Sequence, residues 1–205
     1  AAYLLLKDIF PQNAVDMGMM REGGAAHRFF RGKERRLYLL SDKIGCMSEA
    51  NARYLLEHNG GIGEGDVEVC PNSLQPVDRR VPGGQKPEIR SRYGLPEGKR
   101  LFVYGGNIGR PQGIPSMVEC LRACEGVPDA HFLIVGDGTE RASLEKLVAG
   151  MENVTVMRAL PREEYDRLVG ACDVGLIFLD PRFTIPNFPS RLLAYLQAGV
   201  PVIAC

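Results

Sequence analysis

NFPSRLLAYLQAGVPVIAC, residues 187–205, shows the unit from which the fold is built: a loop, a one-sided helix, a glycine stop and a buried strand. Pro189 and Ser190 are expected to open the helix, with Ser190 as the N-cap for the amides that follow. Gly199 is expected to end it. The apolar stripe of this helix consists of Leu192, Leu193 and Leu196.

Residues 202–205 have no polar face, which is typical of a strand buried in a parallel sheet. The free amides at the start of the preceding helix would suit an anionic ligand. The chain ends within this strand and begins with the strand-like segment 3–6. We therefore expect it to be a piece of a longer protein.

The same order of strand, loop and helix precedes this stretch. Apolar segments indicate strands at 100–104, 131–135, 154–157, 174–178 and 201–205, and one-sided patterns indicate helices at 114–124, 139–149, 162–170 and 190–198. Strands and helices that alternate with short loops predict a doubly wound parallel α/β sheet of the Rossmann-like kind. Ligands of such sheets bind beyond the carboxyl ends of the strands.

The first half of the chain is less regular. Its patterns indicate strands at 3–6, 43–47 and 67–69, and helices at 13–30, 33–40 and 48–58. Gly23 and Gly24 would interrupt the first helix, and Ser48 would cap the last. Proline, glycine and charge dominate after residue 71. The expected division is therefore the end of an incomplete first domain at 1–75, a linker at 76–98 and a second domain at 99–205.

Composition excludes several classes of protein. The 25 basic and 25 acidic residues cancel, so no global charge favours nucleic acid as a partner. The six cysteines form no CxxC pair, and a structural zinc site needs four ligands, so neither a metal nor a cofactor is expected. Reduced, packed thiols suit a cytoplasmic location. No apolar run approaches the roughly 20 residues of a membrane-spanning helix.

The glycine-rich loop YGGNIGRPQG, residues 104–113, follows the first strand of the second half. Its glycines let a ligand approach the backbone, and Arg110 supplies a cation suited to a phosphate. The loop lacks the GK[ST] of a P-loop and the spacing of the dinucleotide fingerprint. A ligand-binding loop and a tight structural turn both fit these residues.

Two further loops follow later strands. In VGDG, residues 135–138, the glycines are expected to form a turn and Asp137 to cap a helix. The proline-rich loop 180–189 leads into the last helix. Arg182 and Arg191 beside it are either ligand-facing cations or solvent-exposed ones, and Tyr195 is expected in the core. The three histidines, His27, His58 and His131, stand in no catalytic spacing.

Four strings of the second half together resemble the donor-binding domain of glycosyltransferase family 4, a retaining group with the GT-B fold. The strings are FVYGGNIGRPQGI (102–114), HFLIVGDGTERASL (131–144), NVTVMRALPREEYDRLVGACDVGLIFL (153–179) and PSRLLAYLQAGVPVIA (189–204). In the first half, LLKDIFPQNAVDMG (5–18) and KIGCMSEANARYLLEHN (43–59) resemble the variety found in capsule and O-antigen assembly.

The resemblance implies a nucleotide sugar bound mostly against the second domain. The residues implied near its diphosphate and sugar are Gly106, Asn107, Arg110, Gln112, Gly113, Pro189, Ser190 and Arg191. Those implied near its nucleobase and ribose are Arg158, Ala159, Leu160 and Ala194. Cations and helix amides, without a metal, would stabilise the charge on the leaving diphosphate. The catalytic residue is expected from the first domain and is not identified.

Two departures from the family pattern concern polar groups. Gln112 stands where relatives often have a lysine, which removes one cation from the site. Pro186 and Ala194 stand where the family commonly has two glutamates, one for the sugar and one for the ribose hydroxyls. Since an alanine side chain accepts no hydrogen bond, ribose recognition would be weaker or come from elsewhere.

The leading hypothesis is a glycosyltransferase that moves a sugar from a UDP-sugar to a lipid-linked saccharide of a bacterial capsule or surface polysaccharide. A non-catalytic binding protein of the same fold and a dinucleotide-dependent oxidoreductase or epimerase are the alternatives. The basic cluster at 33–36 suggests peripheral contact with the inner face of the membrane, and a solvated helix face would explain it equally.

Overall fold

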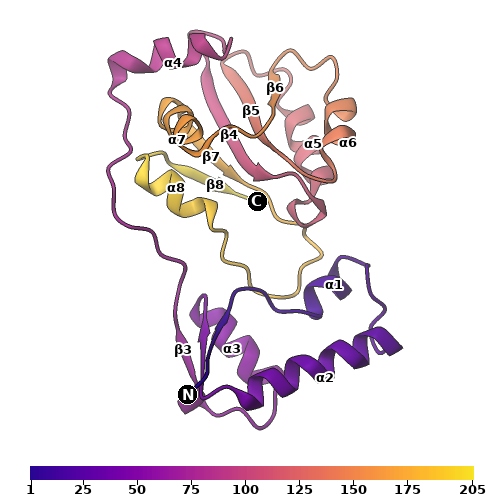
Figure 1. Ribbon diagram of the computed structural model, residues 1–205. Helices are drawn as coiled ribbons and strands as arrows, with labels where there is room; N and C mark the ends of the chain where they lie inside the picture. The colour runs from indigo at the N-terminus through magenta and orange to yellow at the C-terminus, as the bar shows by residue number, and fades with distance from the viewer. The chain divides into compact units, whose positions relative to one another are not determined.

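The computed structural model describes residues 1–205 as two compact units (Figure 1). Unit 1 consists of Ala1–Ser73 together with Arg182–Phe188. Unit 2 consists of Leu74–Pro181 together with Pro189–Cys205. No helix in either unit has the length and apolar character needed to cross a membrane.

Unit 2 is built on a five-stranded parallel sheet (Figure 1). Its strands are β4 (Arg100–Asn107), β5 (Ala130–Asp137), β6 (Val154–Met157), β7 (Val174–Ile177) and β8 (Val202–Ala204). They lie in the order β6-β5-β4-β7-β8. The order reverses between β4 and β7, as in a doubly wound sheet, so the predicted fold class is confirmed.

Both faces of this sheet are covered by helices, which are α4 (Lys86–Arg92), α5 (Ile114–Ala123), α6 (Arg141–Leu147), α7 (Arg162–Ala171) and α8 (Arg191–Gln197). Alternate side chains of each strand enter opposite cores. Tyr104 and Ile134 pack with α5 and α6 in one cluster. Leu101 and Val103 pack with α4, α7 and α8 in the other. Each strand is therefore apolar on both faces, which explains its continuous apolar sequence.

The predicted last helix is correct in place and wrong in two details. Ser190 has helical backbone angles, φ −60° and ψ −27°, and its side chain makes no capping hydrogen bond, so the expected N-cap is absent. Leu196 is 61% exposed and does not belong to the packed stripe. Tyr195 is fully buried and donates to the carbonyl oxygens of Val103 and Leu176, as a core residue should. Gly199, at φ +66°, ends the helix as predicted.

Unit 1 is a three-stranded parallel sheet in the order β1-β2-β3. Its strands are β1 (Tyr3–Leu6), β2 (Lys43–Cys46) and β3 (Val67–Val69), and its helices are α1 (Gln12–Asp16), α2 (Ala25–Leu40), α3 (Glu49–His58) and the short 3-10 turn η1 (Glu64–Asp66). The amide of Asn51 donates to the Ser48 hydroxyl at 3.2 Å, so the predicted cap of α3 is confirmed.

The helix expected at 13–30 is wrong. α1 stops at Asp16, and α2 starts at Ala25 and continues through the separate helix expected at 33–40. Gly18 and Gly23 hold the left-handed φ angles +67° and +68°. These conformations are incompatible with a continuous α-helix and favour glycine, which explains the break.

Two segments cluster differently from the division expected from composition. The stretch expected as a linker contains the 3-10 turn η2 (Gly83–Gln85) and α4, and it packs on unit 2 through an ion pair between Arg79 and Asp166. Conversely, Ile185 is buried in the core of unit 1, and Thr184 hydrogen-bonds the Asp16 carboxylate there. Contacts made by one or two residues of a segment produce no periodic pattern in the sequence, so the division into units could not be predicted from periodicity.

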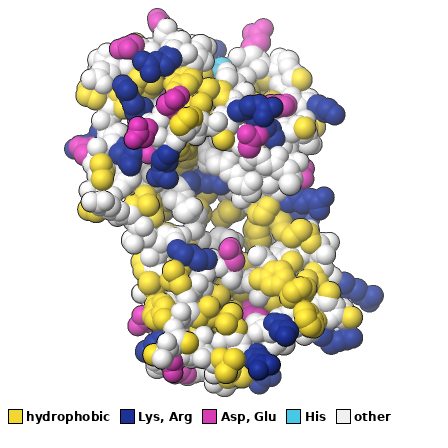
Figure 2. Space-filling view, in the orientation of Figure 1, with side chains coloured by type: hydrophobic (Ala, Val, Ile, Leu, Met, Phe, Trp, Pro, Cys, Tyr) yellow, Lys and Arg dark blue, Asp and Glu magenta, His cyan; other side chains and the backbone are white.

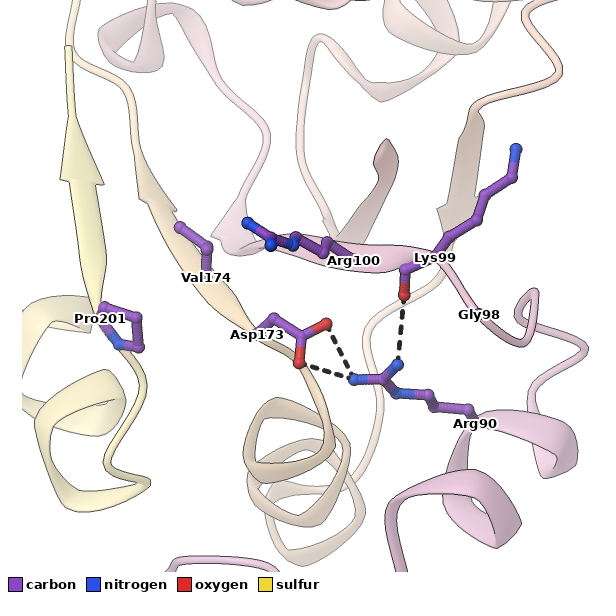
Figure 3. A pocket seen from close by; sticks show the side chains of 7 residues that line it. All are labelled: Arg90, Gly98, Lys99, Arg100, Asp173, Val174 and Pro201. Atoms are coloured by element: carbon purple, nitrogen blue, oxygen red, sulfur yellow. Dashed lines mark hydrogen bonds and ion pairs between the residues drawn. The ribbon is translucent and has the colours of Figure 1, made fainter. Parts of the chain in front are cut away.

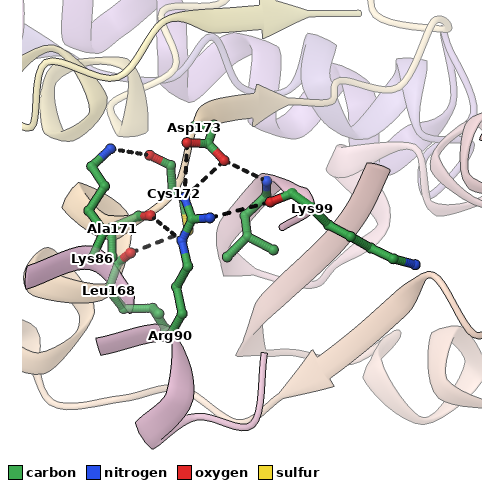
Figure 4. Close-up of polar contacts among 8 residues, drawn as sticks. Lys86, Arg90, Lys99, Leu168, Ala171, Cys172 and Asp173 are labelled. Carbon is green, nitrogen blue, oxygen red and sulfur yellow. Dashed lines mark hydrogen bonds and ion pairs between the residues drawn. The ribbon is translucent and has the colours of Figure 1, made fainter. Parts of the chain in front are cut away.

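Arg90 joins α4 to the amino-terminal end of the main sheet. Its guanidinium donates to both carboxylate oxygens of Asp173 at 2.9 Å and to the carbonyl oxygens of Lys99 and Ala171 (Figure 4). A hollow of about 520 Å³ lies beside it, between the starts of β4, β7 and β8 (Figure 3). The charged groups of Arg90 and Asp173 already satisfy each other there, so the hollow offers no free charge from this pair to a ligand.

We expect Arg90→Ala to lower the free energy of unfolding by about 2–3 kcal/mol, because it leaves Asp173 and two carbonyl groups without their partner. Denaturant unfolding monitored on unit 2 measures the change. Arg92→Ala is the matched control on the same helix: Arg92 is 57% exposed and pairs only with Glu88 at 3.6 Å. Its change should stay within about 0.5 kcal/mol. Equal losses in both variants would contradict the role of Arg90.

Candidate functional site

A cavity of about 770 Å³ opens at the carboxyl ends of β4 and β5 in unit 2. Its lining residues are Leu74, Gly105, Gly106, Asn107, Gln112, Val135, Gly136, Asp137, Ala159, Leu160, Arg162, Tyr165, Ser190, Arg191 and Ala194. They come from the carboxyl ends of β4 and β5, from the segment after β6, from the starts of α7 and α8, and from Leu74 at the beginning of unit 2. The carboxyl edge, beside the reversal in strand order, is where doubly wound sheets bind their ligands.

The floor of the cavity is bare backbone. Gly106 on β4 and Gly136 on β5 are partners in the parallel register. A Cβ atom on Gly136 would lie 1.8 Å from the carbonyl oxygen of Gly106, and one on Gly105 would lie 1.7 Å from the hydroxyl of Tyr165. No larger residue fits at these positions without movement of its neighbours. These positions therefore require glycine, because neighbouring atoms of the protein occupy the place of a side chain.

Arg191 holds a positive charge above this floor. Its guanidinium carbon lies 4.2 Å from the centre of the Tyr104 ring, within the range of a cation–π contact. Its Nη2 atom lies 3.7 Å from the position of a Cβ on Gly106. Its Nη1 atom is buried and has no hydrogen-bond partner. Because an unsatisfied buried donor is costly, this group is suited to an anionic ligand that would complete it.

Burial raises the pKa of Tyr104 above its usual value, and the positive charge of Arg191 opposes that shift. Burial likewise raises the pKa of Tyr165. Both phenols are therefore protonated near neutral pH, so neither serves as a base. The hydroxyl of Tyr104 donates to the carbonyl oxygen of Asn107 at 2.7 Å and holds the end of β4 in place.

Gln112 organises the loop after β4. Its side-chain oxygen accepts from the amide of Gly109 at 3.1 Å and from the side chain of Asn107 at 3.4 Å. The side-chain oxygen is thus occupied within the loop, while the side chain still reaches the cavity wall. Where the family resemblance implies a lysine, this chain has a neutral side chain that holds the loop together.

The structure brings eight of the twelve residues implied by the family resemblance into the cavity wall: Gly106, Asn107, Gln112, Ala159, Leu160, Ser190, Arg191 and Ala194. The other four, Arg110, Gly113, Pro189 and Arg158, lie outside the lining set. Arg110 is 63% exposed and contacts Glu140 at 3.4 Å. Gly113 serves a turn at φ +58°, where a Cβ would lie 3.0 Å from the Cα of Asp180.

The cavity wall also contains Asp137, Arg162 and Tyr165, which the family resemblance does not imply. Asp137 was expected to cap a helix, but it does not. Its carboxylate instead forms an ion pair at 3.2 Å with Arg141, the first residue of α6. Arg162 and Tyr165 share the first turns of α7, after β6. Ligands of doubly wound sheets bind beyond the carboxyl ends of the strands, so the position of these two residues after β6 marks them as candidates for the site. No group of three or more His, Cys, Asp or Glu side chains in residues 1–205 could hold a metal ion.

A glycine floor under an arginine whose Nη1 atom is buried without a partner, at the carboxyl edge of a doubly wound sheet, is suited to a phosphate-bearing ligand. Residues 85–205 match the model of the family described as glycosyl transferases group 1. The match covers more than half of the chain, and the chain belongs to this family.

Two curated relatives extend the comparison. The chain is 28% identical over 208 residues to WbjE of Pseudomonas aeruginosa, named as a probable glycosyltransferase, with 98% of this chain and 50% of that protein covered. It is 33% identical over 162 residues to WcaI of Escherichia coli (strain K12), named for colanic acid biosynthesis as a glycosyl transferase, with 77% of this chain and 39% of that protein covered. The chain thus spans half of these relatives or less.

The fold resembles that of Alr3699/HepE of Anabaena, solved in complex with UDP-glucose. The TM-score is 0.74 at 16% sequence identity, and the match covers 98% of this chain and 52% of the other. At this identity the likeness establishes the fold alone. It confirms the GT-B type of architecture that the sequence predicts.

We expect Gly136→Ala to lower the free energy of unfolding by about 2 kcal/mol or more, because the added methyl group meets the backbone of Gly106. Chemical denaturation measures the loss. Gly126→Ala is the matched control, since a Cβ there meets no atom within 4 Å. If Gly136→Ala were as stable as the control, the close packing of β4 and β5 at the floor would be disproved.

Proposed function

We propose that the protein transfers a sugar from a nucleotide donor, a UDP-sugar, to a lipid-linked saccharide in the biosynthesis of a bacterial capsular or surface polysaccharide. The observation that carries this proposal is the unpaired, buried Nη1 of Arg191 over the glycine floor, in a member of a glycosyltransferase family. The name of WcaI supports the polysaccharide pathway, and the UDP-glucose complex of HepE supports the donor.

In this proposal the donor diphosphate lies on the peptide groups of Gly106 and Gly136, under the guanidinium of Arg191. The nucleobase extends toward Ala159 and Leu160, the apolar end of the cavity, and the ribose lies near Ala194. Arg110, Gly113, Arg158 and Pro189 surround this core as outer contacts.

Bond cleavage leaves extra negative charge on the diphosphate, and a fixed cation stabilises that charge more in the transition state than in the ground state. The ring of Tyr104 holds the Arg191 guanidinium at this place in the cavity wall, which suits it to this role. The proposal includes transfer with retention of the anomeric configuration, and it requires neither a metal nor a cofactor in the donor-binding domain.

The division of labour between the two halves of the chain is also part of the proposal. Residues 1–75 supply the acceptor side, residues 99–205 bind the donor, and the catalytic residue comes from the acceptor side. The protein acts in the cytoplasm, at the inner face of the membrane, where a lipid-linked acceptor would be presented.

The proposal predicts that Arg191→Ala weakens UDP binding by about 1.5–3 kcal/mol, the range for hydrogen bonds to a charged group. This corresponds to roughly 10- to 150-fold in Kd, measured by isothermal titration calorimetry. Arg122→Ala, on α5 and outside the lining set, should bind UDP as the wild type does. Arg110→Ala tests the outer contact separately. Wild-type protein without UDP affinity would contradict the donor assignment.

Ala194 favours a second candidate, a binding protein of the same fold that does not catalyse transfer. Its methyl group lines the cavity where the resemblance expects a hydroxyl-binding glutamate. UDP-sugar turnover separates the two. We expect the wild type to turn over its donor, and Ala194→Glu to bind UDP more tightly through the ribose hydroxyls. A wild type that binds UDP without turnover, together with an active Ala194→Glu variant, would establish the second candidate.

A further inference from the structure

Arg162, the first residue of α7, is a cation in the cavity wall that has no part in the proposed function. Its Nε atom donates to the two carboxylate oxygens of Asp166, at 3.1 and 2.9 Å. Asp166 is buried and also pairs with Arg79, so its carboxylate is fixed from two sides. The Nη atoms of Arg162 make no hydrogen bond or ion pair within the protein. One edge of the guanidinium is therefore anchored, while the other is free to donate to a ligand.

The place of Arg162 in the fold separates it from the glycine floor. It follows β6, which is the outermost strand of the sheet and stands two places from β4. Since adjacent strands lie about 4.8 Å apart, the end of β6 is about 10 Å from the end of β4. Ala159 and Leu160 line the cavity from the same segment after β6. Arg162 thus belongs to the end of the cavity that the proposed function assigns to the nucleobase.

The first turns of α7 also supply an aromatic wall. Tyr165 comes three residues after Arg162, so the two side chains share one side of the helix. Tyr165 is half-buried, and its hydroxyl occupies the place that a Cβ on Gly105 would take. Ala159, Leu160 and the Tyr165 ring offer apolar contact to a flat base, and Arg162 adds hydrogen-bond donors.

An arginine in this position distinguishes between bases because its side chain donates hydrogen bonds and accepts none. Uracil carries an acceptor oxygen at C4, as thymine does, whereas cytosine carries a donor amino group there. The two pyrimidines are otherwise close in size and shape. C4 lies opposite the N1 atom that joins the ribose, so this group points toward the end of the cavity farthest from the ribose.

We propose that Arg162, oriented by Asp166, selects uracil nucleotides by donating to the O4 atom of the base. This inference rests on the proposed function and names the residue that reads the donor's base. On the face of unit 2 drawn in the upper part of Figure 2, basic and acidic side chains are interspersed, so no broad positive field covers it. A field would in any case attract UDP and CDP equally, because the two carry the same charge. A preference between them requires a contact at the base.

The test compares the Kd values of UDP and CDP for the full chain by isothermal titration calorimetry. We expect the wild type to bind UDP about tenfold more tightly than CDP, at the lower end of the range for a hydrogen bond to a charged group. The lower end applies because the Arg162 side chain is 62% exposed to water.

Two variants remove the donor-only character of this position. R162Q should bring the ratio of the two Kd values to within about twofold of one, because an amide both donates and accepts. R162M, which keeps a long stem and has no donor, should do the same. Asp166 retains Arg79 as its partner in both variants. R167Q is the matched control, since Arg167 is exposed on the same helix and outside the lining set, and it should keep the wild-type ratio.

A ratio that R162Q and R162M leave at the wild-type value would overturn the role of Arg162 and leave the donor proposal intact. Equal losses of UDP and CDP affinity in these variants would overturn it as well, because the cation would then contact the diphosphate. A wild type that binds both nucleotides equally would also contradict selection at O4. A wild type that binds neither would instead refute the proposed donor.

Discussion

The close pairing of β4 and β5 at their carboxyl ends is the constraint on which the site depends. Gly106 and Gly136 stand opposite each other with no room for a Cβ on the latter, so the sheet ends in bare peptide groups. Because no side chain covers these groups, Arg191 can lie directly above them, and its charge faces the floor of the cavity. The binding chemistry thus follows from a packing requirement between two strands.

Two tyrosines, Tyr104 and Tyr195, also hold the site in place beneath Arg191. Tyr104 carries the guanidinium on its ring, and Tyr195 ties the carbonyl groups of β4 and β7 from within the core. Burial raises the pKa of Tyr195 to about 12, so this donor stays protonated throughout the physiological range. Core packing and the polar site therefore share residues, and α8 joins them because it supplies both Arg191 and Tyr195.

Much of unit 2 could be predicted from the sequence. Its strands are apolar on both faces and its helices on one side, and these two patterns differ clearly in period. The predictions that are wrong concern helix ends, where the local sequence preference differs from the backbone conformation that the surrounding structure imposes. Ser190 precedes α8 as a capping residue would, yet its backbone is already helical. The sequence predicts an interruption at Gly23 and Gly24, but the length of the break depends on Gly18 and Gly23 in the left-handed region.

The alternating fold, the glycine loops at the strand ends and the resemblance to a glycosyltransferase family could be predicted from the sequence, because they depend on periodicity and on short motifs. Whether Arg191 or Arg110 lines the cavity depends on the tertiary structure. Arg191 and Arg110 are equivalent as residue types, but the first is held over the Tyr104 ring and the second contacts Glu140 at an exposed position. The choice depends on contacts between residues far apart in the chain, and local patterns carry no record of such contacts.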